Sequence, residues 1–241
     1  WKFFKKIKPD IVHTVTIKPY LYGGIISRIT SVPCLVSAIS GFGSLFISKD
    51  YKSRILRLML YPIYYWAFNH PNQKVIIQNK DDANTLVKWK ILNFNKIELI
   101  KGSGVNLAHF KNLNEPKGIP VICFAARLLR DKGIYDFISA AKILNLRNIK
   151  ARFLIAGNLD KKNPSSLTIN NLKKIKKNKY LEFLGHHVDI PKLYSKSHII
   201  CLPSYREGLP KSLLEAGAAG RAIVTTNVPG CRDAILPNKT G

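Results

Sequence analysis

Two glutamates stand eight positions apart near the end of the chain, within the stretch from Ser204 to Asp233, SYREGLPKSLLEAGAAGRAIVTTNVPGCRD. Glu207 is followed by Gly208 in a predicted loop, and Glu215 belongs to a predicted helix rich in small residues. Carboxylates accept hydrogen bonds from hydroxyl groups, and the free N–H groups at a helix N-terminus bind anions. This combination indicates a ligand with a diphosphate between two hydroxyl-rich groups. The alternative is a capped surface helix with two solvated glutamates.

Basic residues follow an apolar run earlier in the chain. Residues 119–126 form that run, and the segment RLLRDKG continues it from Arg127 to Gly133. A strand that ends in basic residues and a glycine turn presents a phosphate site at the carboxyl edge of an open sheet. Arg127 and Lys132 are therefore candidates for binding a diphosphate, although each alone would be an ordinary surface cation.

The elements that must position these residues alternate between strand and helix. Short apolar runs predict strands at 10–13, 32–39, 75–78, 98–100, 119–126, 152–156, 180–184, 198–202 and 222–226. Helices are expected at 24–29 (opened by Gly23-Gly24 after a loop), 51–68, 81–89, from 134, 170–177, 191–194 and from Pro210 to a stop at Gly220. This order predicts an α/β fold with parallel sheets and crossover helices.

A polar segment divides the chain into two expected domains. Residues 111–118 contain Pro116 and Gly118 and are the best candidate for a linker. We therefore expect a first domain at 1–110 and a second at 119–241.

The sequence around the two glutamates resembles the glutamate-x7-glutamate motif of retaining glycosyltransferases of family 4. The resemblance implies two Rossmann-like domains facing a cleft (the GT-B type) and a nucleotide-sugar donor. It implies that Glu207 contacts the donor sugar, that Glu215 contacts the nucleotide ribose, and that Arg127 and Lys132 clamp the diphosphate. Backbone atoms near the sugar and diphosphate would come from Gly208, Leu209, Pro210, Ser212 and Leu213.

The first half of the chain is similar to a subgroup of that family that makes capsular, O-antigen and related polysaccharides on a lipid-diphosphate carrier. The similarity rests on PDIVHTVTIKPYLYGG, ISGFGSLF and IIQNKDD, and GSGVNLAHF resembles the signature GxGVDxxxF. It implies that His13, Lys18 and the loop with Gly41 and Gly43 lie near the cleft. Val15 stands where the family pattern has a second histidine, which puts activity in doubt.

The resemblance also implies that the chain is truncated at both ends, so that both domains are incomplete. Family members have a glycine-rich loop before the residues present here and a closing segment after them. An inactive fragment is therefore one alternative to an active enzyme.

The composition is strongly basic, with 39 Lys and Arg against 14 Asp and Glu and a net charge of +25. Such a charge favours nucleic acid, anionic lipid or phosphorylated partners. The lysines are scattered and no nucleic-acid-binding motif is present, so nucleic acid is not expected, although a basic nucleic-acid-binding protein stays an alternative. The segment WKFFKKIKPD predicts a basic amphipathic helix, either lying on anionic lipid or packed on a sheet.

The four cysteines show no C-x2-C pair, and Cys123 and Cys201 fall within strand-like runs. This pattern predicts buried free thiols in a reducing cytosol. We therefore expect a cytoplasmic protein, with peripheral contact to the cytoplasmic face of the inner membrane as the further option.

The reaction implied by the resemblance is transfer of a hexose or N-acetylhexosamine, with retention, from a UDP-linked sugar to a polyprenyl-diphosphate-linked saccharide. No Asp-x-Asp motif occurs in a suitable context, and Asp81-Asp82 is typical of a helix start. We therefore expect no metal or other cofactor, with Arg127, Lys132 and a helix N-terminus supplying fixed positive charge. The enzymatic rival is a glycoside hydrolase, which also uses two carboxylates but needs no diphosphate clamp.

Overall fold

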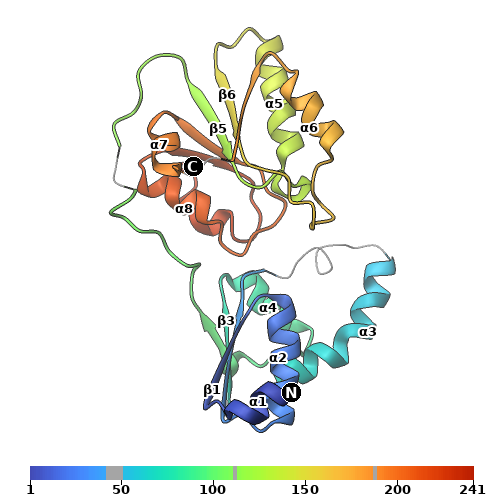
Figure 1. The fold of residues 1–241 in the computed structure, drawn as a ribbon. Helices are drawn as coiled ribbons and strands as arrows, with labels where there is room; N and C mark the ends of the chain where they lie inside the picture. The colour runs from blue at the N-terminus through green and yellow to red at the C-terminus, as the bar shows by residue number, and fades with distance from the viewer. Residues whose placement is uncertain (42–50, 111–112, 187–188) are drawn as a thin grey trace. The chain divides into compact units, whose positions relative to one another are not determined.

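The structure is a computed structural model that describes residues 1–41, 51–110, 113–186 and 189–241. It divides into two compact units, Trp1–Gly102 and Ser103–Gly241, each with its own parallel sheet (Figure 1). The division at Gly102 precedes the polar segment 111–118 that the sequence indicates as a linker.

The first unit contains a parallel sheet whose strands follow chain order. These strands are β1 (Ile11–Val15), β2 (Cys34–Ile39), β3 (Gln73–Ile77) and β4 (Ile97–Leu99). The helices are α1 (Lys2–Ile7), α2 (Ile17–Ile29), α3 (Tyr51–Phe68), α4 (Lys80–Lys88) and the short 3-10 turn η2 (Phe94–Lys96). Parallel strands joined by crossover helices confirm the predicted α/β class.

The start of α2 corrects one prediction. The helix begins at Ile17, so Gly23 and Gly24 lie inside it and do not open it. A Cβ on Gly24 would stand 2.4 Å from the Ala67 carbonyl oxygen of α3, and one on Gly23 would stand 2.7 Å from Thr14 Cγ2. The two glycines are therefore required for close packing of α2, a need that local turn rules do not reveal.

The helices α1 and α3 are weakly embedded in the first unit. None of the residues of α1 is buried and only Phe4 is partly covered, so any packing of this helix on the sheet is peripheral. α3 continues through Pro62 as one helix over the predicted residues, and its buried residues are Tyr64, Ala67 and Phe68, all in its last turns. Tyr64 and Phe68 pack with Tyr20 and with apolar residues of β2, β3 and α4.

The second unit contains a parallel sheet in the order β7-β6-β5-β8-β9. The strands are β5 (Val121–Ala125), β6 (Arg152–Ala156), β7 (Leu181–Gly185), β8 (Ile199–Leu202) and β9 (Ala222–Thr225). The helices are α5 (Ile134–Leu146), α6 (Ile169–Lys176), α7 (Ile190–Ser195) and α8 (Lys211–Ala218), with the 3-10 turns η3 (Arg130–Lys132) and η4 (Arg232–Ala234). Figure 1 shows α5 and α6 on one face of this sheet and α7 and α8 on the other.

The direction of winding reverses between β5 and β8. From β5 the chain builds outward through β6 to β7, and it then returns to place β8 on the other side of β5. The loops after β5 and β8 therefore leave the sheet toward opposite faces, and ligands of such sheets bind in the crevice that opens between them.

The core of the second unit is apolar and holds free thiols. Phe124, Phe137 and Tyr194 are among its largest fully buried side chains. Burial raises the pKa of Cys123 to about 12 and that of Cys201 to about 11. All four cysteines of the chain are free, as predicted, and these two resist forming the reactive thiolate.

A buried arginine, Arg221, links distant segments of the second unit. The Arg221 guanidinium donates to the carbonyl oxygens of Ala219, Ser197 and Asn114, at 3.0, 3.2 and 3.2 Å. It therefore fastens the end of α8 to the chain segment that precedes β5. The sequence marks Arg221 only as one more cation, because its partners lie far away along the chain.

Candidate functional site

The loops after β5 and β8 are joined through their backbones at the reversal point. The Asp131 carbonyl oxygen accepts a hydrogen bond of 2.9 Å from the Tyr205 N–H. Gly133 has a φ of 74°, and a Cβ there would stand 1.9 Å from the Pro203 carbonyl oxygen. Only glycine fits this contact, so the predicted glycine turn also sets the spacing between the loops. We call residues 127–133 and 203–215 the switch-point site.

Lys132 and Glu207 face each other across the switch-point site. The Lys132 Nζ lies 2.5 Å from Glu207 Oε1, and their side chains are 22% and 11% exposed. The Ser204 hydroxyl lies 2.8 Å from the same carboxylate oxygen. Two residues predicted as functional, 75 positions apart, are thus in direct contact. Ser204 was missed, because a single serine beside a loop carries no sequence signal.

The turn after β9 also contacts the backbone of Glu207. The Glu207 N–H donates to the Pro229 carbonyl oxygen at 3.3 Å. Gly230 has a φ of 79°, and a Cβ there would stand 2.5 Å from the carbonyl oxygens of both Glu207 and Gly208. The loop that carries Glu207 is therefore held by turns from β5 and β9, and Gly208 is buried between them.

The N-terminus of α8 forms one wall of the switch-point site. Pro210 is the N-cap of α8 and has a ψ of 116°. The sequence predicts Pro210 at the first helical position, which Lys211 occupies instead. The Tyr194 hydroxyl donates to the Ser212 carbonyl oxygen at 3.2 Å, which ties the first turn to α7. Leu209 and Leu213 are buried, so their side chains are not available to a ligand. The Leu213 N–H donates to the Pro210 carbonyl oxygen at 3.1 Å, so the N–H groups of Lys211 and Ser212, which precede it, are the ones that suit an anion.

Glu215 lies on the same helix, with its side chain 13% exposed. Its carboxylate stands 3.5 Å from Lys211 Nζ, as predicted for residues four apart. Burial raises the pKa of the Glu215 carboxyl above its ordinary value, and the Lys211 ammonium opposes this rise. A partly desolvated carboxylate of this kind gains from hydroxyl donors that replace its lost water.

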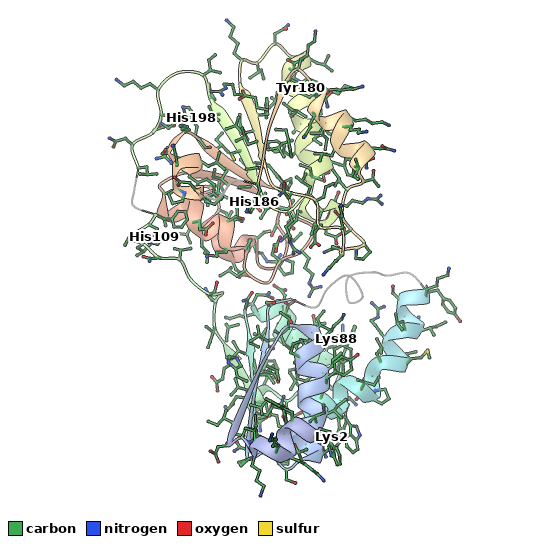
Figure 2. All side chains as sticks on the ribbon, in the orientation of Figure 1. Lys2, Lys88, His109, Tyr180, His186 and His198 are labelled. Carbon is green, nitrogen blue, oxygen red and sulfur yellow. The ribbon has the colours of Figure 1, made fainter. Side chains whose placement is uncertain are left out.

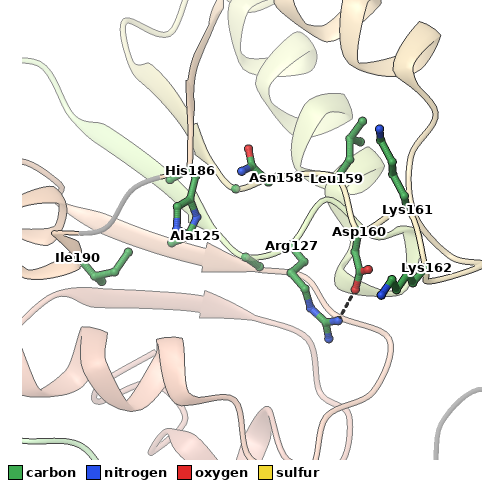
Figure 3. A pocket seen from close by; sticks show the side chains of 12 residues that line it. Ala125, Arg127, Asn158, Leu159, Asp160, Lys161, Lys162, His186 and Ile190 are labelled. Atoms are coloured by element: carbon green, nitrogen blue, oxygen red, sulfur yellow. Dashed lines mark hydrogen bonds and ion pairs between the residues drawn. The ribbon is translucent and has the colours of Figure 1, made fainter.

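Arg127 pairs with an acid that the sequence did not single out. Its Nη1 lies 2.7 Å from Asp160 Oδ2, and the arginine is 59% exposed (Figure 3). Both residues line a pocket of about 730 Å³ at the carboxyl ends of β5, β6 and β7, together with Asn158 and His186. Asp160, Asn158 and His186 are additional candidates for ligand contact, and their only sequence signal is that they follow strand ends.

His186 comes directly after β7 and is labelled in the whole-chain view (Figure 2) and in the pocket (Figure 3). The pocket floor is made by small residues, and a Cβ on Gly157 would stand 1.9 Å from the Ala126 carbonyl oxygen. The strand ends of β5 and β6 therefore approach closely, which leaves a shallow hollow with polar side chains at its rim.

Two candidate residues of the first unit, Lys18 and Gly41, lie near the carboxyl edge of its sheet. Lys18 lies in the first turn of α2 just after β1, and Gly41 follows β2 with a φ of 146°. His13 is exposed within β1, which extends to Val15, so it does not end the strand as predicted. Thr16, between β1 and α2, has the unusual φ of 73°. Gly43 lies outside the described residues.

The adjacent acids Asp81 and Asp82 belong to a helix start, as predicted. The Asn79 side chain caps α4 by accepting a hydrogen bond of 2.8 Å from the Asp82 N–H. Within the described ranges, no group of three or more His, Cys, Asp and Glu side chains is placed to hold a metal ion.

Two family models together account for most of the chain. The model described as "Glycosyl transferases group 1" matches residues 106–241, and "Glycosyl transferase 4-like" matches residues 1–79. The first match covers more than half of the chain and includes the whole switch-point site. The chain belongs to the group 1 glycosyltransferases. The family resemblance read from the two glutamates is thereby confirmed.

Two curated relatives of this group 1 chain are glycosyltransferases whose names contain a sugar linked to diphosphoundecaprenol. It is 31% identical to the N,N'-diacetylbacillosaminyl-diphospho-undecaprenol alpha-1,3-N-acetylgalactosaminyltransferase of Campylobacter jejuni, over 97% of the chain and 63% of the relative. It is 30% identical to the UDP-Gal:alpha-D-GlcNAc-diphosphoundecaprenol alpha-1,3-galactosyltransferase of Escherichia coli, over 95% and 61%. The chain thus spans about three fifths of the length of these relatives.

Solved structures show the same fold. Sucrose-phosphate synthase from Thermosynechococcus elongatus matches with a TM-score of 0.78 and 20% identity, over 100% of this chain and 61% of that one. Anabaena HepE in complex with UDP-glucose matches with a TM-score of 0.73 and 16% identity, over 94% and 62%. The α/β, GT-B type of fold is confirmed. Among the described residues, no helix combines the length and the apolar character needed to cross a membrane.

Proposed function

We propose that the switch-point site binds a nucleotide sugar, and that the protein transfers its hexose or N-acetylhexosamine to a polyprenyl-diphosphate-linked saccharide. The observation that carries this proposal is the 2.5 Å contact between Lys132 and Glu207 beside the N-terminus of α8. A cation for phosphate, a carboxylate for hydroxyls and free helix N–H groups are thereby available within one site. The acceptor class is supported by the names of both relatives, which contain diphospho-undecaprenol or diphosphoundecaprenol.

The proposed glycosyl transfer requires stabilisation of the departing diphosphate. The bond between the anomeric carbon and the diphosphate oxygen breaks while a bond to the acceptor oxygen forms, and negative charge accumulates on the leaving group. Arg127 and Lys132 turn from their carboxylate partners toward this charge, and the α8 N–H groups add to it. Glu207 then accepts hydrogen bonds from sugar hydroxyls, and Glu215 accepts them from the ribose. Retention of configuration is proposed from the family resemblance.

The proposed place of action is the cytoplasmic face of the inner membrane. The lipid-linked acceptors in the names of the relatives support contact with a membrane, and four free cysteines support a reducing compartment. In the first unit, His13, Lys18 and Gly41 are the residues proposed to face the acceptor.

Calorimetry with a panel of nucleotide sugars tests the donor site. We expect a UDP-linked hexose or N-acetylhexosamine to bind the chain, and Arg127→Ala and Glu215→Ala to weaken binding at least about tenfold each, as loss of a charged hydrogen bond implies. Arg152→Ala is the matched control, because Arg152 forms an exposed pair with Glu182 on neighbouring strands. Equal affinity in wild type and both site variants would remove the assignment. Hydrolysis of a simple glycoside without any nucleotide would favour a hydrolase.

A further inference from the structure

The helix α3 exposes large apolar side chains along most of its length. Tyr51, Leu58 and Met59 are 76%, 70% and 69% exposed. The other exposed large apolar or aromatic residues of the helix are Ile55, Leu56, Tyr61, Ile63, Tyr65 and Trp66. Soluble proteins rarely expose contiguous apolar surface of this kind unless it binds something.

The exposed residues form a continuous face. At 100° per residue, Tyr51, Ile55, Leu58, Met59 and Trp66 fall on the side of the helix opposite to its buried residues, which are confined to the last turns. Figure 1 shows α3 running outward from α2, and Figure 2 shows side chains of its first turns standing clear of the rest of the unit. We call this side of α3 its outer face.

The charge of α3 indicates what the outer face binds. The sequence YKSRILRLMLYPIYYWAF contains Lys52, Arg54 and Arg57 and no acidic residue. The first unit as a whole has 16 Lys and Arg residues against five Asp and Glu, counted over 1–102. An apolar face flanked by basic residues matches an anionic lipid surface, with hydrocarbon below and phosphate at the rim.

Aromatic and guanidinium groups approach each other around α3, both at the outer face and on the side turned away from it. The Arg28 guanidinium lies 4.8 Å from the ring centre of Trp66, and the Arg57 guanidinium lies 5.4 Å from that of Trp89. Arg54, Arg57, Leu58, Tyr61 and Trp89 together line a hollow of about 420 Å³. Tryptophan and tyrosine favour the polar boundary of a bilayer, and paired guanidinium groups suit a headgroup phosphate.

We propose that the outer face of α3 docks the first unit on an anionic phospholipid bilayer, lying in the plane of the headgroups. The helix is too short and too interrupted by charge to cross the bilayer, in agreement with the absence of a spanning helix among the described residues. This inference does not rest on the proposed donor site, which belongs to the second unit.

Co-sedimentation of the whole chain with vesicles tests the proposal. We expect binding to phosphatidylcholine vesicles that contain about one third phosphatidylglycerol, weaker binding to pure phosphatidylcholine, and loss of affinity as salt is added. Leu58→Ser with Met59→Ser is expected to lower the partition coefficient about tenfold or more, because apolar area is lost from the bilayer. Lys52→Gln and Arg54→Gln are expected to lower it roughly fivefold each on anionic vesicles and little on neutral ones.

The control is an exposed apolar pair on another helix. Ile143→Ser with Leu146→Ser removes exposed side chains from α5 and is expected to leave vesicle binding unchanged. Circular dichroism checks that each variant folds, and nucleotide-sugar calorimetry on the same samples reports the second unit separately. Vesicle binding that is equal in the wild type and the α3 variants, or absent from the wild type, overturns the proposal. Self-association that the Leu58 and Met59 substitutions abolish, without vesicle binding, assigns the face to a second copy of the chain and also overturns it.

Discussion

The Lys132 ammonium lies 2.5 Å from Glu207 Oε1, and this ion pair joins the loop after β5 to the loop after β8. The contact occurs where the winding of the second sheet reverses, which is the place where open parallel sheets bind ligands. Because both side chains are largely buried, the pair is held in one geometry and is more than a surface attraction. The two residues therefore act as one unit in the predictions that concern the donor.

Substitution of either partner is expected to impair transfer strongly. Lys132→Met and Glu207→Gln should each lower the rate at least about a hundredfold, since each removes a group aimed at the leaving diphosphate or the sugar. The double variant should lose less than the two losses combined, because the partners are coupled. Steady-state transfer to a lipid-linked acceptor measures this. Glu182→Gln, at an exposed pair of the same unit, is the control and should be near wild type.

The ion pair between Arg127 and Asp160 predicts that one substitution preserves or raises the affinity for UDP. Asp160→Asn releases Arg127 from a partner 2.7 Å away that competes with the diphosphate. Exposed pairs contribute up to about 1 kcal/mol, so we expect UDP to bind with equal affinity or up to about fivefold more tightly. Titration of UDP into both proteins measures the change. A tenfold weaker affinity would mean that Asp160 itself contacts the ligand.

The contact at Gly133 predicts a loss of stability with a matched control. Gly133→Ala puts a Cβ 1.9 Å from the Pro203 carbonyl oxygen at a φ of 74° and should cost about 2–4 kcal/mol in unfolding free energy. Gly217→Ala, inside α8 with open space around it, should be neutral or stabilise by about 0.5–1 kcal/mol. Urea denaturation measures both. Similar midpoints for the two variants would contradict the close approach of the loops.

The raised pKa of Glu215 predicts a specific dependence on pH. The folded state holds the Glu215 proton more tightly than the unfolded state, so unfolding free energy falls as pH rises from the ordinary glutamate pKa to the raised one. Glu215→Gln should remove this part of the pH dependence. Donor affinity should decrease as pH falls through the raised pKa, because the neutral carboxyl accepts hydrogen bonds less well. Urea denaturation measures the unfolding free energy and calorimetry measures the donor affinity, both between about pH 4 and pH 7, where glutamates titrate.

Transfer is expected to be independent of divalent metal. In the proposed mechanism, fixed cations at the switch-point site supply the charge that a metal ion gives to other enzymes of this chemical class. Treatment with a chelator should leave the transfer rate unchanged at fixed concentrations of nucleotide sugar and acceptor. Abolition of activity by the chelator and its rescue by Mn²⁺ would refute this prediction.

Local sequence patterns were sufficient for much of the second unit. The strand at 152–156 and the start of α5 at Ile134 were predicted as observed, because a short apolar run and a glycine turn determine them. Strand-edge reasoning predicted Lys132 at the carboxyl edge of the sheet, whereas its direct contact with Glu207 was not predicted.

Other features depend on partners that are distant in sequence. Gly23 and Gly24 predicted a helix start, yet they serve the packing of α2 against Ala67 and Thr14. Asp160 had no local signal for its pair with Arg127, and Arg221 gave no sign of its burial. Periodicity reports which face of an element is apolar, but it does not report what that face meets.

The pairing of three cations with carboxylates also bears on selectivity. Arg127, Lys132 and Lys211 already face Asp160, Glu207 and Glu215, so these three pairs are electroneutral before ligand binds, in a chain with a net charge of +25. A bare inorganic anion is expected to gain little from these cations, because it displaces the acids without offering them hydroxyl donors. The proposed sugar nucleotide would satisfy both partners at once. Its affinity should therefore respond less to ionic strength than the overall charge of the chain implies.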